Sequence, residues 1–326
     1  MATQQQQRPH DGKLGIVTGG SRGIGAAVAR GLAAKGCNLL LVYTSEASTG
    51  PTQALCEALA STHGIRTSAL QANLLDAETA APRIVEAART FFASYHTSSS
   101  GEDFTIDILI NNAGVSSNQY LNDPEHGPIQ ASEFDRVYRV NVLAPLLLMQ
   151  AVAPHLPKPS AVGGVGLHRG RVVNVSSVSS SIGYSGQSVY AGTKAALEAM
   201  TRCWSRELVG RATVNAVNPG PAWGDMYAEA GPKFWRNNQP HVDAAPLAAY
   251  DGEEEVLRMA ASGHDGENAE KEKDRFDDIV RNGMGGRRPG FTSEIAGTIV
   301  MLCSDEAGWT TGSVVCANGG MKMSIA

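Results

Sequence analysis

The sequence predicts an α/β fold in which a single doubly wound parallel sheet of about seven strands carries helices on both faces. Short apolar runs alternate with helical stretches along most of the chain. The runs are almost continuously apolar, which is typical of strands buried on both sides. With 326 residues, 42% of them hydrophobic, the chain can bury a substantial core. We therefore expect one domain over residues 13–326, preceded by a flexible polar leader over residues 1–12.

The expected strands are bounded by turn residues or by helical patterns. In chain order they cover residues 14–18, 38–43, 66–72, 106–111, 171–176, 212–217 and 312–317. The expected helices cover residues 24–35, 52–63, 77–92 and 132–155, followed by a helix that includes Tyr190.

Three stretches look like insertions into this pattern. Residues 96–103 are Ser-rich, and residues 157–170 carry Pro and Gly but few large apolar side chains. Residues 251–278 hold eleven acidic side chains against four basic ones. This acidic insert belongs to a longer irregular segment, 225–290, which we expect to cover the substrate. It forms either a charged helical flap or a disordered loop.

Composition excludes several classes of function. The net charge of −5 argues against nucleic-acid binding, which needs basic patches. The five cysteines are scattered and never paired as Cys-x-x-Cys, and neither they nor the eight histidines have metal-ligand spacing. No apolar run reaches the ~18 residues of a membrane span, and the first ten residues are polar. We expect a cytoplasmic protein that needs no metal and contacts no membrane.

A tyrosine and a lysine lie four residues apart in a run of strong helix formers. Tyr190 and Lys194 would then face the same side of a helix. A neighbouring ammonium favours the phenolate, so we expect Lys194 to lower the pKa of Tyr190. This arrangement suits a general acid or base. A helix with an ordinary Tyr and a solvated Lys is the alternative interpretation.

A glycine-rich turn joins the first expected strand to the first expected helix. Glycines allow a tight turn and a close approach to a pyrophosphate, which the free N–H groups of the helix N-terminus then hold. This context predicts a Rossmann-type dinucleotide site. Its residues are Gly19, Ser21, Arg22, Gly23, Ile24 and Gly25.

These motifs resemble the short-chain dehydrogenase/reductase family in order and spacing, and in particular its ketoacyl- and polyketide-type ketoreductases. The glycine spacing is Gly-x-x-x-Gly-x-Gly, and the resemblance covers roughly residues 13–321. The further matching positions are Asn111–Gly114, Asn141, Ser177, Asn218-Pro219-Gly220, Thr311-Gly312 and Asn318-Gly319-Gly320.

The end of the second expected strand favours NADP over NAD. An NAD site needs an acid there for the ribose hydroxyl, whereas this chain has Thr44 and Ser45. A hydroxyl-rich turn facing the Arg22 guanidinium suits a 2′-phosphate. Glu46 could swing in and reverse this preference. By resemblance, the cofactor also contacts a set of residues along its adenine and ribose path: Asn73, Leu74, Asn112, Ala113, Gly114, Pro219, Gly220 and Ala222.

The resemblance implies a role for each of four residues in reducing a carbonyl. Tyr190 donates the proton as NADPH delivers hydride, and Lys194 binds the nicotinamide ribose. Ser177 polarises the carbonyl, with Ser176 as the alternative. Asn141 fixes a water that links Lys194 to solvent, although alone it would read as a structural amide.

The sequence departs from the family pattern after Pro219-Gly220. The family often places a Thr four residues on, to bind the nicotinamide amide, and this chain has Gly224 there. The main chain near Ala222 remains available for that contact. Four aromatic side chains follow, which either line an apolar substrate pocket or anchor the lid: Trp223, Tyr227, Phe234 and Trp235.

We therefore expect an NADP(H)-dependent oxidoreductase that reduces a ketone or enol tautomer of a small carbonyl substrate to a secondary alcohol. By resemblance the substrate is of a polyketide or β-keto type, and the chain forms a homo-oligomer, a dimer or tetramer. Two alternatives stay open: an NAD(P)-dependent alcohol dehydrogenase working in the oxidative direction, and a non-catalytic NADP-binding scaffold or sensor.

Overall fold

The computed structural model describes residues 8–95, 104–158, 170–224, 227, 231–250, 252 and 267–323. The predicted inserts at 96–103 and 157–170, and the acidic insert before residue 267, lie largely outside the described residues. Seven strands form the main sheet: β1 Leu14–Thr18, β2 Asn38–Tyr43, β3 Thr67–Gln71, β4 Ile108–Asn111, β7 Gly170–Val175, β8 Ala212–Pro219 and β11 Val314–Ala317.

The seven strands lie in the order β11-β8-β7-β4-β1-β2-β3, and every neighbouring pair is parallel. The predicted doubly wound parallel sheet is confirmed. After β1 the chain moves outward through β2 and β3, then returns to place β4 on the other side of β1. Ligands bind at such a switch point, outside the carboxyl ends of the strands.

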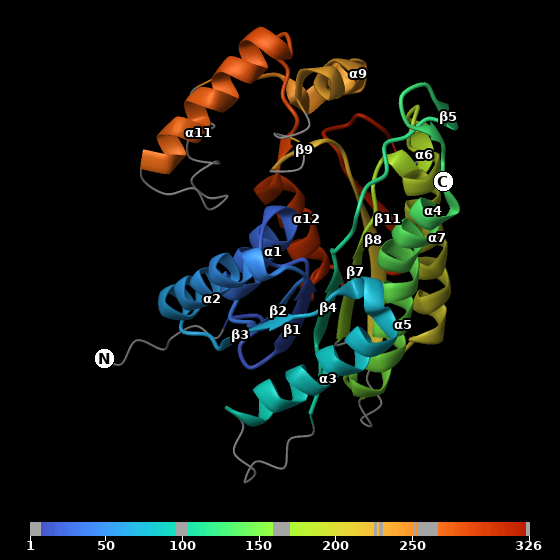
Figure 1. The fold of residues 1–326 in the computed structure, drawn as a ribbon. Helices are drawn as coiled ribbons and strands as arrows, with labels where there is room; N and C mark the ends of the chain where they lie inside the picture. Colours follow the sequence, from blue (N-terminus) through green and yellow to red (C-terminus); the bar gives the residue numbers. More distant parts are fainter. Residues whose placement is uncertain are drawn as a thin grey trace.

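Helices cover both faces of this sheet (Figure 1). One face carries α1 Gly23–Ala34, α2 Thr49–His63 and α12 Thr292–Leu302. The other carries α3 Ala77–Ala93, α4 Ala131–Tyr138, α5 Ala144–Val152 and α7 Ser188–Glu207. Each face has its own apolar core, so the strands are buried on both sides, as their continuous apolar runs require.

The predicted single helix over 132–155 is wrong in one respect. A π turn, Arg139–Leu143, separates α4 from α5, and a short 3-10 turn, Ala153–His155, ends the stretch. By length and composition the whole stretch passes as a membrane span. Here, however, it packs into the core through residues such as Val140, Leu148 and Val152.

A small lid rises above the carboxyl edge of the sheet (Figure 1). It consists of α9 Gly231–Asp243 and α11 Glu267–Asp278, and a two-stranded ribbon of β9 Ala222–Trp223 and β10 Gly290–Phe291 lies at its base. Residues 267–278 of the acidic insert are therefore helical. Trp223 and Trp235 are buried around the fully buried Phe276, so these two aromatics anchor the lid.

Several short elements connect these helices and strands. They are the antiparallel pair β5 Asn122–Asp123 with β6 Gly127–Pro128, the single-turn helix α6 Ser179–Ile182, and the turns η1 Glu46–Ser48, η2 Leu74–Asp76, η5 Pro246–Ala248 and η6 Ile279–Gly283.

The predicted flexible leader is held against the domain in its described part, from Arg8 onward. Arg8 donates to the carbonyl of His63 at 2.6 Å, and the buried His10 donates its backbone N–H to Lys35 at 2.9 Å. From Arg8 onward the leader is therefore part of the domain.

Candidate active site

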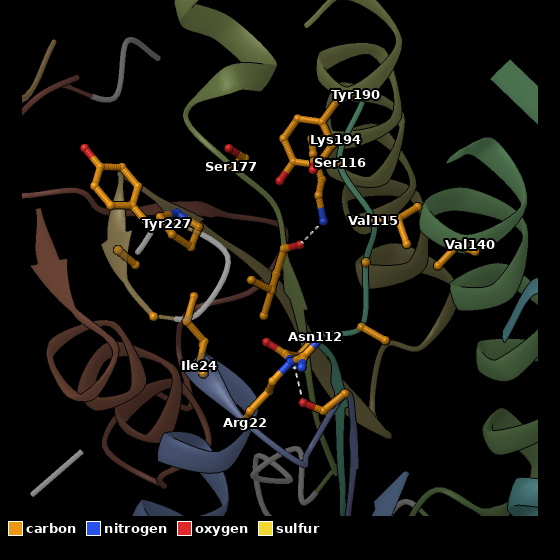
Figure 2. A pocket seen from close by; sticks show the side chains of 18 of the residues that line it. Arg22, Ile24, Asn112, Val115, Ser116, Val140, Ser177, Tyr190, Lys194 and Tyr227 are labelled. Carbon is orange, nitrogen blue, oxygen red and sulfur yellow. Dashed lines mark hydrogen bonds between the residues drawn. The ribbon is translucent and has the colours of Figure 1, made fainter. Parts of the chain in front are cut away.

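A cavity of about 600 Å³ opens at the carboxyl edge of the sheet, where β1 and β4 lie side by side. Its walls come from the turns after β1, β2, β3, β4, β7 and β8 and from the lid. Figure 2 shows Tyr190 and Ser177 on one side, Arg22 and Asn112 at the opposite end, and Tyr227 on the lid side. A dinucleotide and a small substrate are ligands of suitable size for such a site.

The glycine turn after β1 has the tight geometry that its sequence predicts. Gly19 has a φ of +62°, which side-chain-bearing residues rarely adopt. A Cβ on Gly25 would overlap the carbonyl oxygen of Gly19, so only glycine fits without a shift of the turn. Asn112 holds the turn by donating from Nδ2 to the carbonyls of Thr18 at 2.9 Å and Gly19 at 3.1 Å. The backbone can therefore approach a pyrophosphate at the start of α1.

The turn after β2 carries hydroxyls beside the Arg22 side of the cavity. Thr44 and Ser45 line it, whereas Glu46 begins a short 3-10 turn and does not. Asn73 lines the same end, and its side chain accepts from the N–H of Leu75 at 3.1 Å. This end of the cavity presents hydroxyls, an amide and a guanidinium, a set that fits a phosphorylated ribose.

Tyr190 and Lys194 come together on the first turns of α7, as predicted, but their electrostatics differ from the expectation. Lys194 is buried, and its Nζ donates to the carbonyl of Val175 at 2.8 Å (Figure 2). Nζ lies 5.6 Å from the centroid of the Tyr190 ring.

The prediction that Lys194 lowers the pKa of Tyr190 is wrong in this structure. Burial raises the pKa of Tyr190, and the lowering contribution comes from the Ser177 hydroxyl. Burial also lowers the pKa of Lys194 to about 8, against the charge of Glu198, which raises it. Desolvation disfavours the charged form of each group, so it raises the pKa of the phenol and lowers the pKa of the ammonium. Tyr190 is therefore protonated at neutral pH, the state that a proton donor requires.

Ser177 begins a chain of hydrogen bonds along the cavity wall. Its Oγ donates to Ser179 Oγ at 3.1 Å, and Ser179 Oγ donates to Gln187 Oε1 at 2.7 Å. Gln187 Nε2 then donates to Asn118 Oδ1 at 2.8 Å. Ser177, Gln187 and Asn118 all line the cavity, which gives it one hydrogen-bonding wall beside the Tyr190 hydroxyl.

Asn141 lies in the π turn between α4 and α5 and is buried behind the cavity. Its amide accepts from the N–H of Val115 at 2.9 Å and donates to the carbonyl of Val115, also at 2.9 Å. It donates as well to Thr193 Oγ1 at 3.1 Å. The side chain therefore fixes the segment after β4 against α7. Its predicted role in holding a water stays a prediction.

Gly224 lines the cavity, as expected for its position after Pro219-Gly220. A Cβ there would lie 3.6 Å from Cγ2 of Thr292, which begins α12 and also lines the cavity. A threonine from another element thus lies beside the position where the family pattern has one.

The four aromatic side chains of the lid segment either line the cavity or anchor the lid. Tyr227 and Phe234 line the cavity, whereas Trp223 and Trp235 do not.

Nearly all residues predicted from the sequence surround this one cavity. The exceptions are Gly25, which shapes the turn, and Asn141, which lies behind Gly114. Sequence reasoning missed a set of polar lining residues: Ser116, Asn118, Arg136, Tyr184, Gln187, Asn238 and Thr292. Ser116 and Asn118 follow the carboxyl end of β4, where ligand contacts are common, so that position was an available signal. The described residues contain no cluster of three or more potential metal ligands.

The chain is similar to known proteins in sequence and in fold. A family model described as short chain dehydrogenase matches residues 13–233. An L-xylo-3-hexulose reductase of Hypocrea jecorina is 66% identical over 98% of this chain and 99% of its own length. An L-xylulose reductase of Aspergillus niger is 52% identical over 97% and 99%. Among solved structures, a blue fluorescent protein from a metagenomic library in complex with NADPH aligns with a TM-score of 0.71 at 27% identity, over 96% of this chain and 99% of that one.

Proposed function

The chain belongs to the short-chain dehydrogenase family of oxidoreductases, and on that premise we propose that it reduces the keto group of an open-chain sugar with NADPH. The observation that carries the proposal is the Ser177–Gln187–Asn118 wall beside Tyr190. Such a wall offers amide and hydroxyl partners to a substrate that has hydroxyls next to its carbonyl.

The relatives favour a keto sugar over the polyketide-type substrate expected from the sequence. The L-xylo-3-hexulose reductase and the L-xylulose reductase are both named for the reduction of a ketose, and this chain aligns with almost the entire length of each. A polyhydroxylated substrate needs several polar partners, because a hydroxyl that is desolvated without one costs about 1–3 kcal/mol. Tyr184 and Asn238 add polar groups on the lid side of the cavity.

The turns at the Arg22 end support NADP. Arg22, Thr44 and Ser45 would hold the 2′-phosphate, and the N-terminus of α1 the pyrophosphate. Thr292 would offer its hydroxyl to the nicotinamide amide, in place of the side chain that Gly224 lacks. The bound cofactor would supply a hydride for the carbonyl carbon.

The chain's own groups would handle the proton and the orientation of the substrate. Ser177 Oγ would donate a hydrogen bond to the carbonyl oxygen, and the phenol of Tyr190 would transfer its proton to that oxygen. The carbonyl π bond breaks, and one new C–H bond and one new O–H bond give a secondary alcohol. Lys194 would bind the nicotinamide ribose and stabilise the phenolate that remains after transfer.

The test is the oxidation of NADPH by purified protein with a panel of substrates. The panel holds L-xylo-3-hexulose, L-xylulose, a 2-ketohexose and a ketone of similar length without hydroxyls. We expect the ketoses to give kcat/KM values at least about tenfold above the plain ketone, since each lost polar contact to a buried partner costs roughly a factor of ten. Equal or better turnover of the plain ketone would contradict the proposed substrate class, and a preference for NADH would contradict the proposed cofactor.

A further inference from the structure

One carboxylate oxygen behind the active site receives three hydrogen bonds. Glu198 lies on α7, one helical turn beyond Lys194 and two beyond Tyr190. Its Oε1 accepts from Ser176 Oγ at 2.6 Å, from Ser180 Oγ at 2.7 Å and from Asn218 Nδ2 at 3.2 Å. We propose that Glu198 is a positioning residue that fixes the turn carrying Ser177 against α7 and whose negative charge stabilises the Lys194 ammonium.

The three donors surround Ser177 on its own turn and on the neighbouring strand. Ser176 directly precedes it after β7, and Ser180 lies in α6 directly beyond it. Asn218 is on β8, and its Nδ2 also donates to the backbone carbonyl of Ser177 at 3.0 Å. Glu198 thus connects α7, which carries the proton donor, to both sides of the residue that would polarise the carbonyl.

The three hydrogen bonds from Ser176, Ser180 and Asn218 to Glu198, here called the clamp, differ from the contacts of a solvated surface charge. Hydrogen bonds to an ionised acceptor are roughly twice as strong as neutral ones. Glu198 is half-buried, and its three donors are buried or half-buried. A displacement of about 1 Å at a catalytic group can cost as much as a hundredfold in rate. A fixed distance between Ser177 and Tyr190 therefore matters for turnover.

The charge of Glu198 has a second effect, on Lys194. Glu198 and Lys194 lie four residues apart on α7, which places them on the same face of the helix. Burial opposes the ammonium of Lys194, and the charge of Glu198 favours it. The titratable groups beside Lys194 are Tyr190 and Glu198, both on α7. The other neighbours in the described part of the chain are uncharged: the carbonyl of Val175, the backbone at Gly114 and the Asn141 amide. Without Glu198, Lys194 would lose its proton at a lower pH.

The test compares four variants by pH profile. Glu198→Gln removes the charge but keeps an acceptor for the serine hydroxyls, and Glu198→Ala removes both. Ser180→Ala removes one contact of the clamp and leaves the charge. Glu207→Gln makes the same charge change at the exposed far end of α7 and is the matched control. Two quantities are measured across pH: kcat/KM for NADPH-dependent ketone reduction, and NADPH affinity from tryptophan fluorescence.

We expect the alkaline limb of both profiles to move to lower pH by roughly half a unit or more in Glu198→Gln. In Ser180→Ala we expect kcat/KM to fall with the limb unmoved, and Glu207→Gln should match the wild type. Glu198→Ala should show the shifted limb and a larger loss of kcat/KM than Glu198→Gln. Thermal unfolding of each variant establishes that it is folded.

Either half of the inference can be refuted separately. If the limb of Glu198→Gln coincides with that of the wild type, the charge role is wrong. If Glu198→Ala and Ser180→Ala both keep the wild-type kcat/KM on the plateau at pH values below the alkaline limb, the role of Glu198 in positioning Ser177 is wrong. The inference rests on the proposed reductase reaction but not on its sugar: any ketone that the wild type reduces serves as substrate. Failure to reduce ketoses would therefore contradict the proposed substrate and leave this test intact.

Discussion

Replacing Gly25 by alanine tests whether the turn after β1 is a cofactor cradle. The added Cβ would overlap the Gly19 carbonyl oxygen and lie 2.6 Å from Nδ2 of Asn112. Ordinary contacts lie at about 3.5–4 Å, so the turn must open by about 1 Å. Overpacking of this kind costs about 1–3 kcal/mol. Two hydrogen bonds from Asn112 to the turn, at 2.9 and 3.1 Å, weaken as well, at about 1 kcal/mol each.

We expect Gly25→Ala to weaken NADPH binding at least about tenfold, equivalent to 1.4 kcal/mol, while the protein stays folded at room temperature. Isothermal titration calorimetry gives the affinity, and thermal unfolding gives the stability. Gly50→Ala is the matched control, because nothing lies within 4 Å of the added Cβ at that helical position. Wild-type NADPH affinity in folded Gly25→Ala would refute the assignment of this turn to the cofactor.

Three further predictions concern other parts of the account. Arg22→Ala should raise the Kd for NADPH about tenfold or more and leave that for NADH unchanged, since Arg22 lines the ribose end of the cavity; equal effects on both cofactors would contradict a 2′-phosphate contact. Burial lowers the pKa of His10 from 6.5 to about 4, so the unfolded chain binds more protons between these values and stability falls as pH drops through that window. His10→Leu should therefore remove up to about 3 kcal/mol of the stability lost between pH 7 and pH 4, measured by urea unfolding; identical pH slopes in both proteins would show that His10 is not the cause. Phe276 lies on α11 and is fully buried inside the lid. Its replacement by alanine should cost about 3 kcal/mol of stability and raise the KM for the ketone more than the Kd for NADPH; an unchanged KM would show that the lid does not shape the substrate site.

The sheet and the cofactor turn were predictable because their signals are local. Each of the seven strands is a short apolar run with boundaries visible in the sequence, and two of them, β1 and β2, match the prediction residue for residue. The glycine turn needs only its own residues and the strand and helix that flank it. The strands β9 and β10, with two residues each, are too short to show any periodicity. The helix α12 follows the irregular lid segment and was also missed.

Features that depend on tertiary packing were not predictable. The apolar pattern of residues 131–155 is the same for a continuous helix as for one with a π turn. The turn occurs where Asn141 binds the backbone of Val115, a contact between distant segments. The clamp at Glu198 likewise joins α7 to residues 18 to 22 positions earlier and 20 positions later.

The pKa of Tyr190 shows why spacing alone misleads. Four-residue spacing correctly predicts that Tyr190 and Lys194 share a helix face, and a charge at that distance would lower the pKa of an exposed phenol. Enclosure at the end of the cavity reverses the direction, because desolvation acts on both groups. The sequence carried no measure of that enclosure.

The most direct test of the central claim is the single-turnover rate of NADPH oxidation in wild type and in Tyr190→Phe, with L-xylo-3-hexulose as substrate. The variant removes only the hydroxyl, so the cavity and the NADPH affinity should stay close to wild type. Loss of a general acid typically costs 10²–10⁴-fold in rate, and we expect a drop of at least about a hundredfold. A Tyr190→Phe enzyme that binds NADPH normally and reduces the ketose within about threefold of the wild-type rate would contradict the account.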